Sequence, residues 1–79
     1  MKLTLKEWRR LKEVSQEAMA KVCGVHVNTY RAWEEKPSTI KLGDAMKLAE
    51  RLDITLDDII FLPNQMDALP LQNGVLLLR

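Results

Sequence analysis

Apolar residues recur at helical spacing along most of the chain, and residues that favour helix ends stand between the apolar groups. The first group follows Thr4, which has Glu7 three residues later, as in a capping box. This pattern predicts a helix over residues 5–13. Leu5 and Trp8 are three positions apart and are expected to face inward together.

A second helix is predicted over residues 16–23, with Ser15 as its N-cap. Three of its residues are spaced to share one buried face, namely Met19, Ala20 and Cys23. Gly24 is expected to end this helix, because glycine accepts the left-handed backbone conformation in which many helices terminate.

A third helix is predicted over residues 27–35, with Tyr30 and Trp33 pointing inward. His26 is its expected N-cap, although histidine is not among the residues preferred at that position. A loop should open at Pro37 and Ser38 and lead to the next helix.

A fourth helix is predicted over residues 42–52. Its apolar stripe consists of Ala45, Leu48, Ala49 and Leu52. A short fifth helix should follow Thr55, with the carboxylates of Asp57 and Asp58 near its positive end. Ile59 and Ile60 are expected to close the core.

Residues 64–79 have a different character and are treated as a C-terminal tail. They contain an Asn-Gly pair at residues 73–74, which predicts a hairpin between residues 69–72 and 75–78. Pro70 weakens that hairpin, and an isolated hairpin is marginally stable in water. A dimer contact, packing against the domain and disorder all stay open for this apolar segment.

Length and composition agree with a single all-α domain over residues 1–63, built as a compact bundle of about five short helices. The chain has 79 residues, of which 47% are hydrophobic and 29% charged, a balance typical of folded domains. Neither a secretory signal pattern nor an apolar run long enough to span a membrane is evident. We therefore expect a cytoplasmic protein without membrane association.

The charge distribution is more informative than the net charge of +1. Residues 1–36 contain eight Lys and Arg against five Glu, a balance of +3, whereas residues 37–79 contain four Lys and Arg against six acids, a balance of −2. A basic half favours contact with phosphate groups, although an ordinary solvated surface explains it equally well.

The sequence offers no catalytic constellation, so we predict that the protein is not an enzyme and needs no cofactor. Phosphate-binding glycine loops and activated nucleophiles are absent from it. Cys23 is the single cysteine and is interpreted as a buried structural residue, and His26 is the single histidine. A metal site would need more ligands than these two.

Residues 15–34, SQEAMAKVCGVHVNTYRAWE, resemble the helix-turn-helix of the phage repressor, Cro and XRE group of bacterial regulators. Ala20 stands at the position where the two helices of this family cross closely, and Gly24 stands at the turn between them. Trp33 and Glu34 match the Trp-Glu pair that is usual near the end of the second helix of the motif. The resemblance extends over residues 3–62 and implies a lambda-repressor-like fold. It also implies a rigid corner whose second helix enters the major groove of DNA, which is roughly 12 Å wide.

The resemblance places the base-reading positions on Val27, Asn28 and Ala32. An asparagine can bond to adenine N6 and N7, and the two apolar side chains can contact a thymine methyl. Relatives with glutamine at the apolar positions can form hydrogen bonds there, so this chain is expected to depend more on A·T-rich or shape readout. Helix packing is the alternative for Val27, and a solvated or capping role is the alternative for Asn28.

Backbone contacts are implied at the start of the second helix and around the third. Gln16 matches a phosphate-binding position of the family, and helix N-termini attract anions. Further candidates are Thr29, Arg31, Lys36, Ser38 and Lys41. Lys36 and Lys41 could equally be solvated surface residues. Arg9 and Glu34 match a charged pair that ties the first helix to the end of the third, and both are interpreted as structural.

The sequence therefore predicts a DNA-binding transcriptional regulator, acting as a repressor and as a homodimer on an inverted repeat of double-stranded DNA. The alternative is a protein-interaction module, such as an antitoxin-like protein that binds a partner through the same scaffold or its tail.

Overall fold

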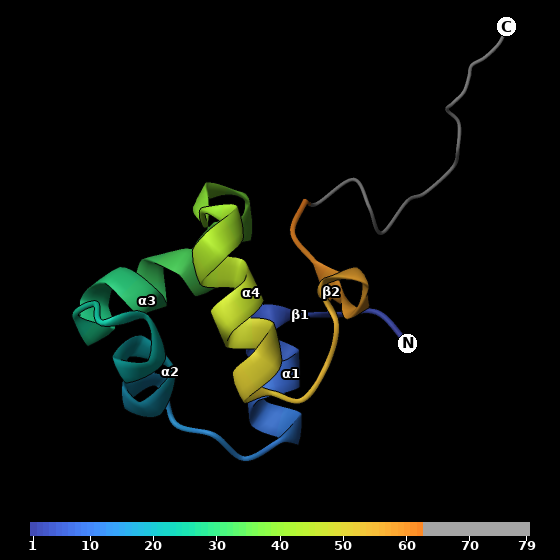
Figure 1. Ribbon diagram of the computed structural model, residues 1–79, viewed down its shortest axis with the longest axis horizontal. Coiled ribbons are helices and arrows are strands. Elements are labelled where there is room, and N and C mark those ends of the chain that lie inside the picture. Colours follow the sequence, from blue (N-terminus) through green and yellow to red (C-terminus); the bar gives the residue numbers. More distant parts are fainter. Residues whose placement is uncertain (63–79) are drawn as a thin grey trace, which may run out of the picture.

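Four α-helices and two 3₁₀ turns make up most of residues 1–62, which are the residues described by the computed structural model (Figure 1). The elements are β1 (Leu3–Thr4), α1 (Leu5–Leu11), α2 (Gln16–Cys23), α3 (Val27–Glu35), η1 (Pro37–Thr39), α4 (Leu42–Arg51), η2 (Leu56–Asp58) and β2 (Ile59–Ile60). This architecture confirms the predicted all-α bundle. The tail predictions for residues 64–79, including the hairpin and the dimer contact, lie outside the described residues.

The helices are arranged around one small core. In Figure 1, α2 and α3 lie at one end of the domain, α1 and the two strands lie at the other, and α4 passes between them. The largest fully buried side chains are Tyr30, Leu5, Met19, Leu48, Leu52 and Ile59. Every α-helix and β2 thus contribute to the core, so the position of α3 is fixed by packing with the whole domain.

Two of the residues expected to be buried are only half-buried. Trp33 packs against the core from the edge, with its ring 6.3 Å from that of Tyr30 in an edge-to-face arrangement. Cys23 is half-buried too, and its thiol donates a weak hydrogen bond to the Asp44 carbonyl over 3.7 Å. Burial raises the pKa of the Cys23 thiol, and the nearby Asp44 raises it further, so the thiolate is disfavoured.

Three of the helices end in the same kind of turn. A residue with left-handed backbone follows each of these ends. Gly24 (φ 68°) comes directly after α2, whereas Glu13 (φ 57°) and Asp53 (φ 58°) come two residues after the last residues of α1 and α4. The next backbone N–H then donates to a carbonyl five residues earlier, in the pairs Val14–Arg9 (3.1 Å), Val25–Ala20 (3.1 Å) and Ile54–Ala49 (3.0 Å). This is the Schellman pattern, which satisfies the last helical carbonyls.

These turns correct the predicted lengths of two helices. The first helix ends at Leu11 rather than at residue 13, because Glu13 is already left-handed. The fourth ends at Arg51 rather than at Leu52. Bounds of 16–23 and 27–35 for the second and third helices are confirmed, as are the caps at Thr4, at Ser15 and at His26, whose Nδ1 accepts from the Asn28 amide at 3.0 Å.

The predicted fifth helix is wrong in kind, since residues 56–58 form a single 3₁₀ turn. Its Thr55 amide and hydroxyl both donate to Asp58 over 3.0 Å, and the chain then becomes extended. In β2, Ile59 is buried and Ile60 only half-buried, because successive strand residues face opposite sides. The strand lies parallel to β1, with Leu3 opposite Ile59. The expected loop at residues 37–38 is likewise a 3₁₀ turn, η1.

Candidate DNA-binding surface

Helices α2 and α3 pack closely together as a corner, and one face of α3 is directed to solvent. Met19 and Ala20 of α2 are buried where the two helices pack, and Tyr30 of α3 is buried opposite them. Gly24 gives the left-handed turn between the helices. A residue with a Cβ would meet no neighbour at Gly24, so the backbone conformation alone favours glycine there.

The three base-reading candidates lie on or beside the exposed face of α3. Asn28 and Ala32 are exposed and four residues apart, so they lie on the same side of the helix. Val27 is half-buried against the core, which leaves only part of its side chain available to a ligand. Arg31 is also exposed, three residues after Asn28.

A nearly buried ion pair connects α1 to the end of α3. Arg9 Nε donates to Glu34 Oε2 over 2.6 Å and Arg9 Nη2 to Glu34 Oε1 over 3.4 Å, while Nη1 donates to the Val14 carbonyl over 3.0 Å. The side chains are 12% and 3% exposed. One guanidinium therefore joins the end of α1, the turn after it and the end of α3.

The surroundings of this pair favour its charged form. Burial alone would raise the pKa of Glu34, but hydrogen bonds and the charge of Arg9 outweigh burial and lower that pKa below its ordinary value. The hydrogen bond to Glu34 raises the pKa of Arg9. Burial also raises the pKa of the Tyr30 hydroxyl, and the adjacent Glu34 carboxylate raises it further. That hydroxyl makes no hydrogen bond of standard geometry to the rest of residues 1–62.

Gln16 connects the buried pair to the exposed face of α3. Its Nε2 donates to Glu34 Oε1 over 3.0 Å, and its Oε1 accepts from Arg31 Nε over 3.1 Å. The side chain that the sequence indicated as a phosphate contact thus has both ends of its amide engaged within the protein. Its position at the first residue of α2 leaves the backbone N–H outside the helical hydrogen-bond pattern.

Arg31 completes the network at the surface. Its Nη1 donates to Asn28 Oδ1 over 2.9 Å, and its Nη2 lies 3.8 Å from Glu17 Oε2. Arg31 is 49% exposed and Glu17 70% exposed, so this ion pair is well solvated. A continuous chain of contacts runs from Arg9 through Glu34, Gln16 and Arg31 to Asn28.

The remaining backbone candidates lie elsewhere around α3. Thr29 is exposed on its first turn, whereas Lys36, Ser38 and Lys41 are exposed on the segment that joins α3 to α4. Glu17 and the internal role of Gln16 were missed from the sequence. The spacing of Asn28 and Arg31, three residues apart on a helix, was a signal for their contact.

Other kinds of site find little support in the part of the chain that the structure describes. No three His, Cys, Asp or Glu side chains of residues 1–62 come together as metal ligands would. None of the helices among these residues combines the length and the apolar character that crossing a bilayer requires.

Comparison with known proteins agrees with this geometry. The family model described as "Helix-turn-helix" matches residues 5–59, which includes all four α-helices and both turns. No curated protein and no solved structure shows a significant match to the chain. The matched family is the Cro/C1-type helix-turn-helix domain, so the chain belongs to the XRE family of DNA-binding regulators.

Proposed function

We propose that the protein is a transcriptional repressor that inserts the exposed face of α3 into the major groove of an operator half-site. The main support is the exposed group of Asn28, Arg31 and Ala32 on a helix whose C-terminal end is fixed by the nearly buried Arg9–Glu34 pair. A rigid helix with polar groups on its outer face is suited to reading base edges. Function on DNA also leads us to expect the protein in the cytoplasm.

In this proposal Asn28 reads a base, while Val27 and Ala32 contact thymine methyl groups. The backbone of the DNA is bound by Gln16, Thr29, Arg31, Lys36, Ser38 and Lys41. The basic charge of the first 36 residues supports attraction to phosphate. The affinity should then fall steeply with salt. For each phosphate neutralised, log K should fall by about 0.9 unit for every tenfold rise in salt concentration. A flat salt response would contradict the proposal.

The test is selection of bound duplexes from a random DNA pool by the full chain and by its Asn28→Ala variant. We expect enrichment of a defined site, with preference relaxed at one base pair in the variant. Arg51→Ala is the control, because Arg51 is an exposed polar residue at the end of α4. It should select the same site as the unmodified protein. No enrichment at low salt would overturn the proposal.

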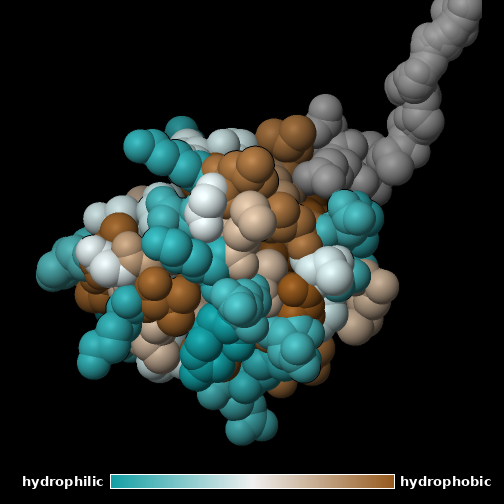
Figure 2. All heavy atoms as spheres, viewed as in Figure 1, coloured by the Kyte–Doolittle hydropathy of each residue, from teal (hydrophilic) through white to brown (hydrophobic). Residues whose placement is uncertain are grey.

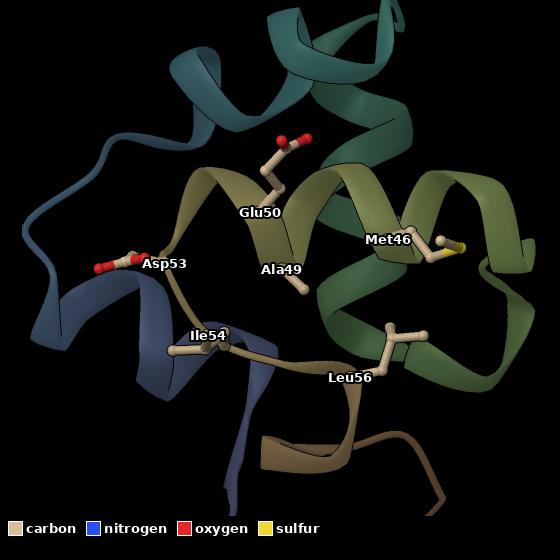
Figure 3. A pocket seen from close by; sticks show the side chains of 6 residues that line it. All are labelled: Met46, Ala49, Glu50, Asp53, Ile54 and Leu56. Carbon is tan, nitrogen blue, oxygen red and sulfur yellow. The ribbon is translucent and has the colours of Figure 1, made fainter.

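We further propose that two copies associate through an apolar surface on α4. Leu42 and Met46 lie one helical turn apart and are 66% and 55% exposed. Two shallow grooves meet beside them at Leu56, and Figure 3 shows Ala49, Ile54, Leu56 and Met46 around one of them, with the carboxylates of Glu50 and Asp53 directed away. In Figure 2, hydrophobic side chains gather between α4 and the segment after β2.

Two-fold association through this surface would match an inverted repeat, since one short recognition helix covers only a half-site. Sedimentation equilibrium of Leu42→Glu tests it, because a buried carboxylate opposes association. Leu11→Glu is the control, since Leu11 is 57% exposed on α1. We expect Leu42→Glu to dissociate the dimer and Leu11→Glu to leave it intact. Monomers of the unmodified protein, alone and on selected DNA, would favour the alternative that this surface binds another protein.

A further inference from the structure

Arg31 contacts two amide side chains and a carboxylate at the same time. Its Nη1 donates to Asn28, its Nε donates to Gln16, and its Nη2 faces Glu17. These partners lie on α2 and on α3 itself, so the guanidinium is held from three directions even though the side chain is 49% exposed. A planar fork with donors at fixed angles is suited to this role.

The contact determines how the Asn28 amide is oriented. A guanidinium has hydrogen-bond donors only, so the Asn28 atom that faces it must be the oxygen. Rotating the amide by 180° would place two sets of donors against each other. The Asn28 Nδ2 group is therefore directed away from Arg31, and the described residues give it no hydrogen-bond acceptor.

The orientation of Arg31 is fixed in turn by the buried part of the network. Gln16 Oε1 accepts from Arg31 because Gln16 Nε2 is engaged by Glu34, over 3.0 Å. Glu34 is held by Arg9, so the order of donors and acceptors is set from the core outward. In such a network, each amide has only one arrangement that pairs every donor with an acceptor.

From this geometry, and resting on the proposed function, we infer that Arg31 is a positioning residue that makes Asn28 present a donor to the DNA and so disfavours cytosine at the base that Asn28 reads. Purines present N7 as an acceptor in the major groove, and thymine presents O4, whereas cytosine presents only its N4 donor. Without Arg31, the amide can rotate and offer its oxygen to cytosine.

This positioning role is additional to the phosphate contact proposed above, and it makes a different prediction. Loss of a phosphate contact weakens binding to all sequences by a similar factor and reduces the salt dependence. Loss of a positioning contact changes the preference at one base pair. Arg31→Lys separates the two, because lysine keeps the charge and lacks the rigid fork.

The experiment measures affinity for four duplexes that differ only at the base pair where Asn28→Ala relaxes the selected site. The unmodified protein should disfavour cytosine by at least about fivefold. Arg31→Ala and Arg31→Lys should both reduce this ratio to below about twofold, and Asn28→Ala combined with Arg31→Ala should cause no further change in the ratio. Arg51→Ala is the matched control, an exposed arginine at the end of α4.

Two results would overturn the inference while the proposed function stands. One is an equal loss of affinity for all four duplexes in Arg31→Ala with the cytosine ratio unchanged. The other needs no DNA, since NMR of the free protein detects the side-chain amide of Asn28 directly. Its resonances should shift in Arg31→Ala and not in Arg51→Ala, and unchanged resonances would contradict the contact. Absence of any DNA binding by the unmodified protein would instead refute the proposed function and this inference with it.

Discussion

The two ends of the polar network that crosses the helix-turn-helix lie in very different surroundings. At the inner end, Arg9 and Glu34 are 12% and 3% exposed and 2.6 Å apart. At the outer end, Arg31 and Glu17 are 49% and 70% exposed and 3.8 Å apart. Gln16 donates to one end and accepts from the other. The same kinds of side chain therefore serve different purposes according to their burial.

The inner end stabilises the fold, and the outer end is available for recognition. Ions removed from water cannot be left without partners, so the inner pair fixes where α3 ends relative to α1. Solvated ion pairs contribute little to the free energy of folding. The comparison indicates that rigidity comes from beneath the DNA-binding face, and that the face itself keeps groups able to bind a ligand.

The largest effect is expected at the inner end. Arg9→Ala leaves the Glu34 carboxylate buried without its cation and should reduce the free energy of unfolding by roughly 3–5 kcal/mol. Denaturant unfolding followed by circular dichroism measures the change. Arg10→Ala, at the exposed neighbouring position, should cost less than about 0.5 kcal/mol. Similar losses of unfolding free energy in both variants would show that the inner pair contributes no more to stability than an exposed arginine does.

Acid should weaken the inner end selectively. Because the folded-state pKa of Glu34 is below its ordinary value of 4.5, the charged pair stabilises the fold above that pH. This contribution is lost as the pH falls through the lower folded-state pKa. Glu34→Gln should therefore flatten the fall in stability on the acid side, as measured by thermal unfolding at a series of pH values. Glu35→Gln, which changes an exposed neighbour, should retain the steep fall.

An intermediate effect is expected at Gln16, which connects the inner and outer ends of the network. Gln16→Ala removes the amide that donates to Glu34 and accepts from Arg31, which should cost about 1 kcal/mol of unfolding free energy. It should also disturb the free-protein NMR signals of the Asn28 side chain, because Arg31 loses one of its contacts. A change in stability with no effect at Asn28 would mean that the two ends are independent.

The smallest change in stability is expected at the outer end. Arg31→Ala removes a half-exposed side chain and a solvated ion pair, and it should alter the free energy of unfolding by less than about 0.5 kcal/mol. The measurement is the same denaturant titration. A loss as large as that of Arg9→Ala would remove the distinction between the two ends.

The helices were largely predictable from local patterns, and the errors in their predicted ends have local causes. Gly24 indicated a helix end, but Glu13 and Asp53 adopt the same left-handed conformation without the residue type that signals it. Their turns are stabilised by the apolar residues that follow, Val14 and Ile54, which pack on the core. The parallel contact of β1 with β2 joins residues 3–4 to residues 59–60, and no local pattern predicts a pairing of segments so far apart in the sequence.

The candidate site was predictable as a set of positions and not as a network. Helical periodicity and the family resemblance indicated Asn28 and Ala32, which are exposed on α3. The partner of each polar side chain depends on how α2 crosses α3, and this crossing is set by packing. Gln16 therefore received a role toward DNA from the sequence alone, whereas its amide contacts in the structure are with Glu34 and Arg31.

The central claim is that DNA meets the outer end of the network on α3 and leaves the inner end unchanged. Backbone amide NMR during titration with a mixed-sequence duplex at low salt tests it directly. We predict the largest shifts at residues 27–32 and at the start of α2, with small shifts on the apolar surface around Leu42 and Met46. Shifts concentrated on that surface, or spread evenly over the domain, would contradict the account.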